Sequence, residues 1–482
     1  MKARIVASFL DEEHRKWWTL VAVAFGLFMI MLDNTVVNVA LPSIQRDLKV
    51  SVAGLEWVVN AYFLTFAVLM LTGGKLADLL GRRRIFIVGL LIFTASSLAC
   101  GLASSGQMLI AARAVQGVGA AMMNPATLSI ITATFPPRQR GLAMGIWVGV
   151  SAVALALGPI TGGPLAEHAH WSWIFFINVP IGVFAILAAR IVIRESKDSS
   201  ADQRLDLPGL VTSGGALLAL TYSLIEANNK GWTSPEILSL FGVAVVGLLA
   251  FVALEKRQRA PMLDLSLFRN RTFAGANATM ALVALAMFGV FFFVSLFVQN
   301  ILHYSPVQAG ASFLPMTLCI IFFAPVAGKL SDRIGSRWLM GGGMGLVSLS
   351  LVLFSLLTQH SSFWNLFPAL LVGGAGMAMA MTPTTAAAMS SVPIDKAGVG
   401  SGVLNSFRQV GGALGIAVMG AILASYLHVP ASTPLGKQQY VDGLHAALLV
   451  SALIAFAAAA VAVALVRVSP QTEHAHIAEM AA

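Results

Sequence analysis

The stretch "GKLADLLGRRR", residues 74–84, recurs later in the chain as "GKLSDRIGSRW", residues 328–338. Six of the eleven aligned positions are identical: Gly, Lys, Leu, Asp, Gly and Arg. Each stretch directly follows an apolar run. Self-similarity at a fixed offset indicates a duplicated architecture. The offset of 254 residues (328 minus 74) therefore predicts two related halves.

The composition predicts a membrane protein with several spans. Hydrophobic residues make up 57% of the 482 residues and charged residues only 11%, whereas soluble proteins average about 25% charged residues. The mean hydropathy is +0.83. Cys100 and Cys319 both lie inside apolar runs, so we expect no disulfide framework. No motif for a metal or a cofactor is present, and we expect neither.

Apolar runs long enough to cross a bilayer occur along the whole chain. A spanning helix needs about 20 mostly apolar residues. We predict an all-α membrane protein with fourteen transmembrane helices. Their ranges are 17–41, 54–73, 85–103, 107–132, 141–165, 171–193, 207–227, 235–254, 272–300, 306–328, 338–357, 363–389, 398–426 and 443–467.

The positive charges orient these spans. With a cytoplasmic N-terminus, four of the 30 Lys and Arg fall in outer loops and two within spans, which leaves 24 on the cytoplasmic side. Such enrichment in short loops marks the cytoplasmic side. The net charge of +9 is thus a topology signal, and we expect no nucleic-acid partner. Both termini are predicted to be cytoplasmic, and the first run is read as a span rather than a signal peptide.

The repeat also predicts the domain organisation. Its offset covers eight spans, so the simplest division is six helices, two inserted helices and six helices. The predicted units are a first six-helix bundle at 1–193, an inserted pair at 194–270 and a second six-helix bundle at 271–482. Long polar connections flank the inserted pair.

Several motifs, in order along the chain, resemble the major facilitator superfamily and its fourteen-helix drug:proton antiporter branch. The resemblance implies alternating-access export of lipophilic small molecules in exchange for protons across the plasma (inner) membrane. The loop at 74–84 carries it, together with "LDNTVVNVALP" (32–42), "RAVQGVGAA" (113–121), "GPITGG" (158–163), "WSWIFFINVPIG" (171–182) and "NSFRQVGGALG" (405–415).

Asp33 and Arg113 are ionisable residues inside predicted spans. At 1.5 Å per residue, Asp33 lies roughly 13 Å and Arg113 about 9 Å from the outer surface. A charge in mid-membrane costs about 2.5–3.5 kcal/mol on insertion scales and usually faces the bundle interior. We expect Asp33 to be the proton-coupling site, with Arg113 as its partner. The alternative is a satisfied packing pair without a transport role.

Other polar residues in the spans are candidates to line a substrate pocket that is otherwise apolar and rich in Phe and Met. Arg408 is equally compatible with a structural role, and Glu226 is a candidate second coupling residue. The pocket candidates are Asn34, Asn38, Asn60, Tyr62, Gln116, Asn405 and Arg408.

Two further motifs concern gating. Asp78 is expected to cap a helix of the other bundle, with 395–402 as the acceptor, although a simple topology anchor is the alternative. A tight seam in the fifth span is expected where Gly158 and Pro159 interrupt the helix, and an ordinary kinked helix is the alternative. The gating loop comprises Gly74, Asp78, Gly81, Arg82 and Arg83, and the seam comprises Gly145, Gly158, Pro159, Gly162 and Gly163.

Taken together, these features predict a proton-coupled multidrug efflux antiporter, not an enzyme. Its expected partners are small lipophilic, cationic substrates, protons and the lipid bilayer, and we expect it to function as a monomer. A lipid exporter or flippase of the same fold is the main alternative. A non-transporting membrane sensor has less support, because no additional soluble domain is evident in the sequence.

Overall fold

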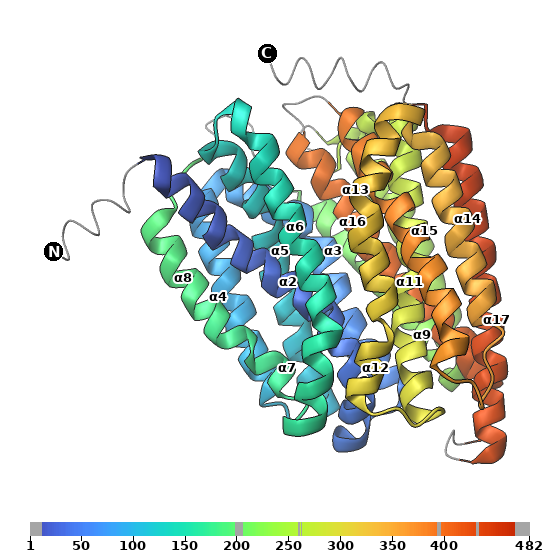
Figure 1. Ribbon diagram of the computed structural model, residues 1–482. Coiled ribbons are helices and arrows are strands. Elements are labelled where there is room, and N and C mark those ends of the chain that lie inside the picture. Colours follow the sequence, from blue (N-terminus) through green and yellow to red (C-terminus); the bar gives the residue numbers. More distant parts are fainter. Residues whose placement is uncertain are drawn as a thin grey trace.

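The computed structural model describes residues 12–197, 206–258, 261, 263–392, 397–429 and 433–467. All regular secondary structure in these residues is helical (Figure 1). The first part of the chain forms α2 (Glu12–Leu48), α3 (Val52–Leu80), α4 (Arg82–Gly101), α5 (Gly106–Thr134), α6 (Pro137–Pro164), the π-helix η1 (Leu165–Ala169), α7 (Trp173–Phe176) and α8 (Asn178–Val192).

The second part follows the same all-helical pattern. It forms α9 (Leu207–Lys230), α10 (Pro235–Arg257), the 3₁₀ turn η2 (Leu265–Arg269), α11 (Arg271–Asn300), α12 (Pro306–Ser312), α13 (Leu314–Ile334), α14 (Ser336–Phe354), α15 (Phe363–Ser390), α16 (Ala397–Tyr426) and α17 (Pro434–Leu465).

Helix starts follow local sequence signals. Ser51, Ser105 and Ser234 precede α3, α5 and α10, and each side chain accepts a hydrogen bond from a backbone N–H in the first turn. Such caps satisfy backbone donors that have no partner inside the helix. Proline in the first turn of α17 extends the last helix back to Pro434, earlier than the predicted start at 443.

Twelve helical stretches in the described residues are long and apolar enough to cross a membrane. The chain is therefore a multi-pass membrane protein. The twelve stretches do not include α5 and α6, which have 29 and 28 residues. Arg113, Gln116 and Asn124 lower the hydropathy of α5. Every one of the fourteen predicted ranges lies on helix, but the count of fourteen spans stays a prediction.

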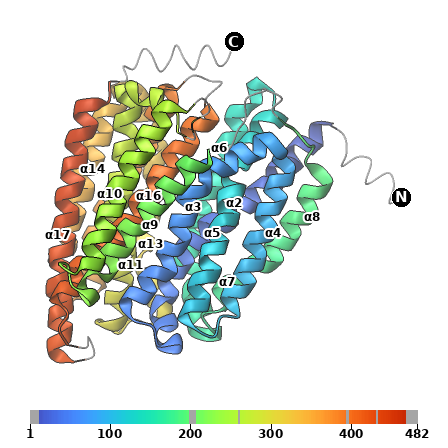
Figure 2. The ribbon, with the colours of Figure 1, turned by 180° about the vertical axis from the view of Figure 1, so that it is seen from behind.

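The helices form two groups that lie side by side (Figure 1). In the first group α3 and α4 pack on α5, and α2 packs on α6 and α8. In the second group α11 packs on α16 and α17, and α14 packs on α15 and α17. The first group comprises α2 to α8 and the second α11 to α17. Helix α9 contacts both α3 and α16, and α10 packs on α9, as the view from behind shows (Figure 2).

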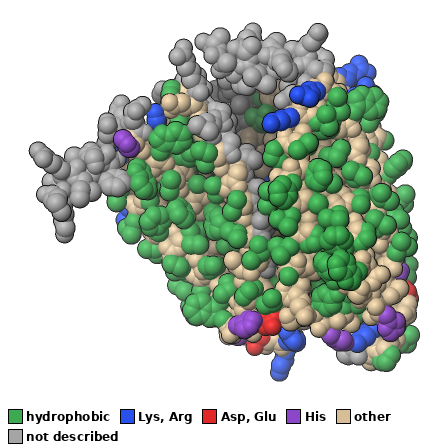
Figure 3. Space-filling model, viewed as in Figure 1, with side chains coloured by type: hydrophobic (Ala, Val, Ile, Leu, Met, Phe, Trp, Pro, Cys, Tyr) green, Lys and Arg blue, Asp and Glu red, His purple; other side chains and the backbone are tan. Residues whose placement is uncertain are grey.

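The outer surface of the helices is apolar. Figure 3 shows hydrophobic side chains along the helices, with Lys, Arg, acidic and His side chains gathered toward the two ends. Helix α10 is the extreme case, because only Ile237, Ala244 and Glu255 of its described side chains are buried. A helix this apolar on its outward face suits contact with lipid.

The repeated loop adopts the same backbone conformation in both copies. Gly81 between α3 and α4 has φ 114°, and Gly335 between α13 and α14 has φ 86°. Side-chain-bearing residues rarely adopt these angles, so glycine is needed at both turns. The duplication seen in the sequence is thus a duplication of structure at this loop. Below, the end of the molecule where α3 connects to α4 is called the α3–α4 end. The opposite end, where α2 connects to α3, is called the α2–α3 end.

One expectation about a helix is wrong. The segment with Gly158 and Pro159 was predicted to interrupt the fifth span, but α6 runs unbroken from Pro137 to Pro164. A proline removes one backbone donor, and membrane helices tolerate this loss where neighbouring groups compensate.

Hydrogen bonds tie the two groups together at the α2–α3 end. Ser295 and Gln299 of α11 donate to the backbone carbonyls of Asn38 and Val39 on α2, at 2.8 and 3.0 Å. These bonds lie in the last two turns of α11 and nearly three turns before the end of α2. The two groups are therefore in close contact at this end of the molecule.

Candidate functional site

The core of the candidate site is an ion pair between Asp33 on α2 and Arg113 on α5. Their side chains are 0% and 1% exposed, and Nη1 of Arg113 donates to Oδ2 of Asp33. Nε of Arg113 also donates to the backbone carbonyl of Val58 on α3, at 3.1 Å. Three helices of the first group thus meet at one guanidinium. The contact that the similar predicted depths allowed is present.

Gln116 closes this pair into a triangle. It lies one turn after Arg113 on the same face of α5, as residues three apart do. Its Oε1 accepts from Nη1 of Arg113 at 2.8 Å, and its Nε2 donates to Oδ1 of Asp33 at 3.0 Å. The thiol of Cys100 on α4 donates to the same Oε1 at 3.7 Å. Both carboxylate oxygens of Asp33 are therefore hydrogen-bonded to α5.

The network continues from Gln116 into α4 and α8. Nε2 of Gln116 lies 3.4 Å from the hydroxyl of Ser97, and Nδ2 of Asn178 donates to that hydroxyl at 3.1 Å. Ser97 in turn donates to the carbonyl of Phe175 at 2.9 Å. A buried polar network in which most groups are paired fixes the relative positions of its helices. Here it fixes helices within the first group only.

Aromatic rings enclose the guanidinium of Arg113. Its Cζ lies 4.3 Å from the ring centroid of Tyr62 and 5.8 Å from that of Phe175. Cations over aromatic faces are attracted by the ring quadrupole, more strongly where water is excluded. Protonation of Asp33 would remove the anion from this enclosure and leave Arg113 with the rings and neutral acceptors.

Some predicted pocket residues are buried but unpaired among the described residues. Both amide atoms of Asn60, the hydroxyl of Tyr62 and Oδ1 of Asn34 have no hydrogen-bond partner there. Buried polar groups are normally paired, so these atoms remain available to a bound molecule. Asn38, which is half-buried, contributes its backbone carbonyl to the contact with Ser295.

The second group contributes a smaller polar cluster on α16. Arg408 is half-buried, and its Nε has no partner among the described residues; the same holds for both amide atoms of Gln409. Asn405 donates to the carbonyl of Ser401 in its own helix at 3.1 Å. Tyr62 is within electrostatic reach of Asp33, Arg113 and Arg408. Tyr62 is therefore near enough to interact electrostatically with both the ion pair and the Arg408 side chain.

A second buried carboxyl group, not among the predicted site residues, lies on the next helix. Glu56 on α3 is 3% exposed. The signal was present, because Glu56 falls inside the predicted range 54–73. Glu226, the predicted second coupling residue, is only half-buried and accepts a hydrogen bond from Asn229 at 3.1 Å.

The predicted gating loop is bonded within the first group. Asp78 accepts from Nε of Arg82 at 3.0 Å, and the backbone N–H of Arg83 donates to Glu195 at 3.1 Å. These bonds hold the start of α4 against the chain that follows α8. Part of the proposed acceptor segment 395–402 lies outside the described residues, so capping by Asp78 stays a prediction. Gly74 and Gly81 lie on the same segment, and a Cβ on Gly74 would meet Pro125 at 3.3 Å.

The predicted glycine seam lies along α6. A Cβ on Gly158 would come within 1.9 Å of Oγ1 of Thr35 on α2, and one on Gly163 within 2.8 Å of the carbonyl of Pro306 on α12. Gly162 similarly abuts α2. Small residues allow such close helix approach in membranes. Gly145 and Pro159 lie on the same helix.

A further contact joins the two groups at the α2–α3 end. Glu167 in η1 accepts from the backbone N–H of Val307 on α12 at 2.9 Å. Hydrogen bonds from the Ser305 hydroxyl and from this N–H hold the pKa of Glu167 below its ordinary value. The carboxylate of Glu167 is exposed, so its protonation follows the pH of the solution at this end of the molecule.

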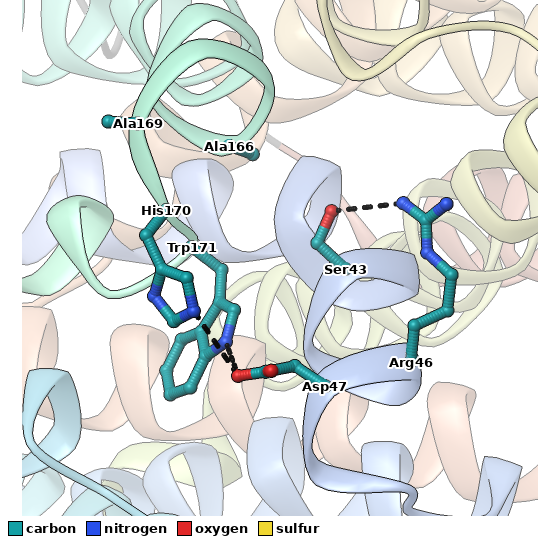
Figure 4. Close-up of a pocket in the computed structure, with 7 residues that line it drawn as sticks. All are labelled: Ser43, Arg46, Asp47, Ala166, Ala169, His170 and Trp171. Carbon is teal, nitrogen blue, oxygen red and sulfur yellow. Dashed lines mark hydrogen bonds and ion pairs between the residues drawn. The ribbon is translucent and has the colours of Figure 1, made fainter.

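A pocket of about 330 Å³ opens near the same end (Figure 4). The indole N–H of Trp171 donates to Asp47 at 2.7 Å, and Nε2 of His170 lies 3.2 Å from the same carboxylate oxygen. These contacts join the end of α2 to the segment before α7. No predicted site residue lines the pocket. It is lined by Ser43, Arg46, Asp47, Ala166, Ala169, His170 and Trp171.

Comparison with known proteins gives a consistent result. Residues 23–416 match the profile of the Major Facilitator Superfamily. The chain is similar to the multidrug resistance protein Stp of Mycobacterium tuberculosis, with 37% identity over 88% of this chain and 80% of that protein. It is also similar to the tetracenomycin C resistance and export protein of Streptomyces glaucescens, with 38% identity over 85% and 76%.

Among solved structures, the chain resembles a bacterial homologue of the human lysosomal transporter Spinster in an inward-facing, unoccupied conformation. The TM-score is 0.66, the identity is 19%, and the match covers 96% of this chain and 98% of that one. At this identity the similarity concerns the fold.

Proposed function

This chain belongs to the major facilitator superfamily, a family of membrane transporters, and we propose that it is a proton-coupled antiporter that exports lipophilic, cationic small molecules by alternating access. The observation that carries the proposal is the buried triangle of Asp33, Arg113 and Gln116. Among the ion pairs of the described residues, the Asp33–Arg113 pair has both side chains almost fully buried. A charge pair that can take up a proton in an otherwise apolar interior is the simplest coupling element.

The proposed coupling step follows from the bonds of Asp33. With Asp33 ionised, α2 and α5 are held together by the pair with Arg113 and by Gln116. Protonation at Oδ2 of Asp33 weakens the contact to Arg113, whose Nε keeps its bond to the carbonyl of Val58. Binding of a proton and binding of a cationic substrate then become alternatives at one site.

The substrate pocket is proposed to lie between the two helix groups, near the midplane, as in transporters built from repeats. Asn60, Tyr62 and Arg408 supply its polar atoms, and neighbouring Phe side chains supply apolar contacts. Phe63 of α3 and Phe288 of α11 approach across the groups, with ring centroids 5.3 Å apart. Relatives named for multidrug resistance and for export of tetracenomycin C support a drug-like substrate.

The proposed topology has fourteen spans in the plasma membrane, with both termini cytoplasmic and a monomer as the working unit. The two helix groups, 1–193 and 271–482, would be the moving bundles, and 194–270 the inserted pair. A tag after Lys230 should then react with an impermeant reagent added to intact cells, whereas a tag after Gln258 should not. Equal labelling of both positions would contradict this topology.

The decisive experiment is export by purified protein in proteoliposomes driven by an imposed pH gradient. A screen of lipophilic cationic dyes identifies a substrate for the wild type. Asp33→Asn should lose uphill transport, because the amide cannot exchange a proton. Asp442→Asn, which changes an exposed carboxylate, is the matched control and should transport normally. Uphill transport by Asp33→Asn would refute the coupling role.

The same preparation separates the lipid-exporter alternative. Substrate-stimulated proton release with dyes, and none with fluorescent phospholipids, supports drug export. Release with phospholipids alone would favour the flippase. A protein that releases protons with neither, and moves neither, would fit a sensor.

A further inference from the structure

Glu56 lies in the second turn of α3, inside the protein. Its residue is 3% exposed, and its Oε2 is buried without a hydrogen-bond partner among the described residues. Its neighbours along α3, such as Leu55 and Val58, are apolar and fully buried. By the helical rise, it lies about 7 Å from the start of α3. A carboxyl group in this setting is unusual, because buried acids are normally paired.

The carboxyl group is enclosed by the contact between the two helix groups. Gly420 lies opposite it on α16, and a Cβ added there would stand 2.2 Å from Oε1 of Glu56. The carboxyl group therefore lies directly against the bare backbone of α16. Helix α9 covers the same place, since Nδ2 of Asn228 donates to the carbonyl of Ala421 at 2.6 Å. Separation of α3 from α16 would expose Glu56 to water.

No cation among the described residues pairs with Glu56. The charged group that acts on it is another acid, Glu226 on α9, which repels a negative charge. Tyr440 on α17 is also within electrostatic reach, but its hydroxyl donates to the carbonyl of Phe293 at 3.0 Å. On α16, Arg408 lies several turns away. Asp33 on α2 and Arg113 on α5 are bonded to each other.

An ionised carboxylate in this position would be desolvated without compensation. Isolated buried charges are so unfavourable that the group takes up a proton instead. Parting of α3 and α16 would hydrate the carboxyl group of Glu56 more fully, and hydration favours its ionised form. Closing of the contact between α3 and α16 and binding of a proton by Glu56 are therefore linked.

We propose that Glu56 must bind a proton before α3 and α16 can close at the α2–α3 end, so that closure of this gate requires a proton from the adjoining solution. In the proposed orientation that solution is the cell exterior. The inference rests on the proposed function for its place in the transport cycle. Export would then need an outside proton at Glu56 for the return to the closed form, in addition to the proton exchanged at Asp33.

The test measures the gate itself and needs no substrate. Spin labels on Val52→Cys and Tyr426→Cys, at the ends of α3 and α16, report the distance across the gate by double electron–electron resonance in nanodiscs. For one linked proton, the open-to-closed ratio of the wild type should rise up to about tenfold per pH unit. In Glu56→Gln the ratio should favour the closed form and lose this pH response above the range in which Glu167 is protonated. Glu226→Gln should keep the pH response.

Two controls keep the result interpretable. Glu56→Leu, which lacks any titratable or polar group, should also lose this pH response. The infrared C=O stretch of a protonated carboxylic acid should be present in the closed wild type and absent from Glu56→Gln. The proposal is overturned if the variants respond to pH as the wild type does, if the wild type does not respond, or if the infrared band is unchanged. Failure of coupled transport with an intact gate response would instead count against the proposed function alone.

Discussion

Two buried carboxyl groups of this protein lie in opposite kinds of place. Asp33 lies inside the first helix group, bonded to Arg113 and Gln116. Glu56 lies between the two groups, against Gly420 of α16, and none of the described cations pairs with it. Both are almost fully buried, at 0% and 3% exposure. The neighbours of Asp33 belong to its own helix group and would move together with it. Glu56 faces the other group, which would move away from it when the gate opens.

Within one helix group, the partners of an acid stay in place during rigid-body motion. An ion pair such as Asp33–Arg113 can therefore be kept through the cycle and released by protonation alone. Between the groups, any charged partner on the far side would be withdrawn each time the gate opens. A proton can neutralise Glu56 there without holding the two groups together. This comparison makes three predictions about the two regions.

The largest effect is expected inside the first group. Arg113→Ala leaves Asp33 without its cation, with only the hydrogen bond from Gln116, and breaking a buried pair in this way destabilises by about 3–5 kcal/mol. The free energy of unfolding in lipid–detergent micelles measures the loss. Arg113→Ala combined with Asp33→Asn removes both charges and should recover most of the stability, while proton coupling stays lost.

Arg84→Ala is the control for that measurement. Arg84 is 68% exposed and lies 3.8 Å from Glu195, and exposed pairs contribute about 0–1 kcal/mol. If Arg113→Ala and Arg84→Ala had the same free energy of unfolding, the buried Asp33–Arg113 pair would not stabilise the fold.

A smaller effect is expected at the gate between the groups. Gly420→Ala places a methyl group 2.2 Å from Oε1 of Glu56, and overpacking of this kind costs typically about 1–3 kcal/mol. The distance across the gate should shift toward the open form, and transport should slow. Gly420→Ala with Glu56→Ala should restore closure. Gly242→Ala on α10, where an added Cβ meets nothing within 4 Å, should change neither readout.

The smallest effect is expected at Glu167. Its contact with α12 requires the ionised carboxylate, and its pKa is lowered in the closed form by the Ser305 hydroxyl and the Val307 N–H. The contact is thus fully present above the ordinary carboxyl range near pH 4.5. It is lost as the pH falls through the lowered pKa.

Glu167→Gln should therefore favour the open gate by about two- to fivefold at pH 7, as expected for an exposed pair. The same labels across the gate measure this change. The wild type should converge with the variant only in strongly acidic solution. A variant identical to the wild type at pH 7 would show that this contact does not hold the gate.

Much of the architecture could be predicted before the structure was known. Apolar runs predicted the main part of each long helix, and the repeat at 74–84 and 328–338 predicted two related halves, which share matching turns at Gly81 and Gly335. These features depend on local sequence, because helix formation and turn geometry involve residues close in the chain. The depth of Asp33 and Arg113 followed from counting residues along two helices.

Pairing between helices was harder to predict. Gln116 was named only as a pocket residue, yet it bonds both members of the ion pair. Glu56 was not among the predicted site residues, and it lies against a helix more than 300 residues later. Neither contact can be predicted from the residues that lie next to Gln116 or Glu56 in the sequence.

The sequence by itself determined that this chain is helical, apolar and duplicated, and that a carboxylate stands in its first span. These properties follow from composition and from spacing along one helix. Only the tertiary structure decided which buried acid has a cation and which lies at the contact between the groups. The electrostatic energy of a buried charge depends on what lies within a few ångströms, and at Asp33 and Glu56 those neighbours come from distant parts of the chain.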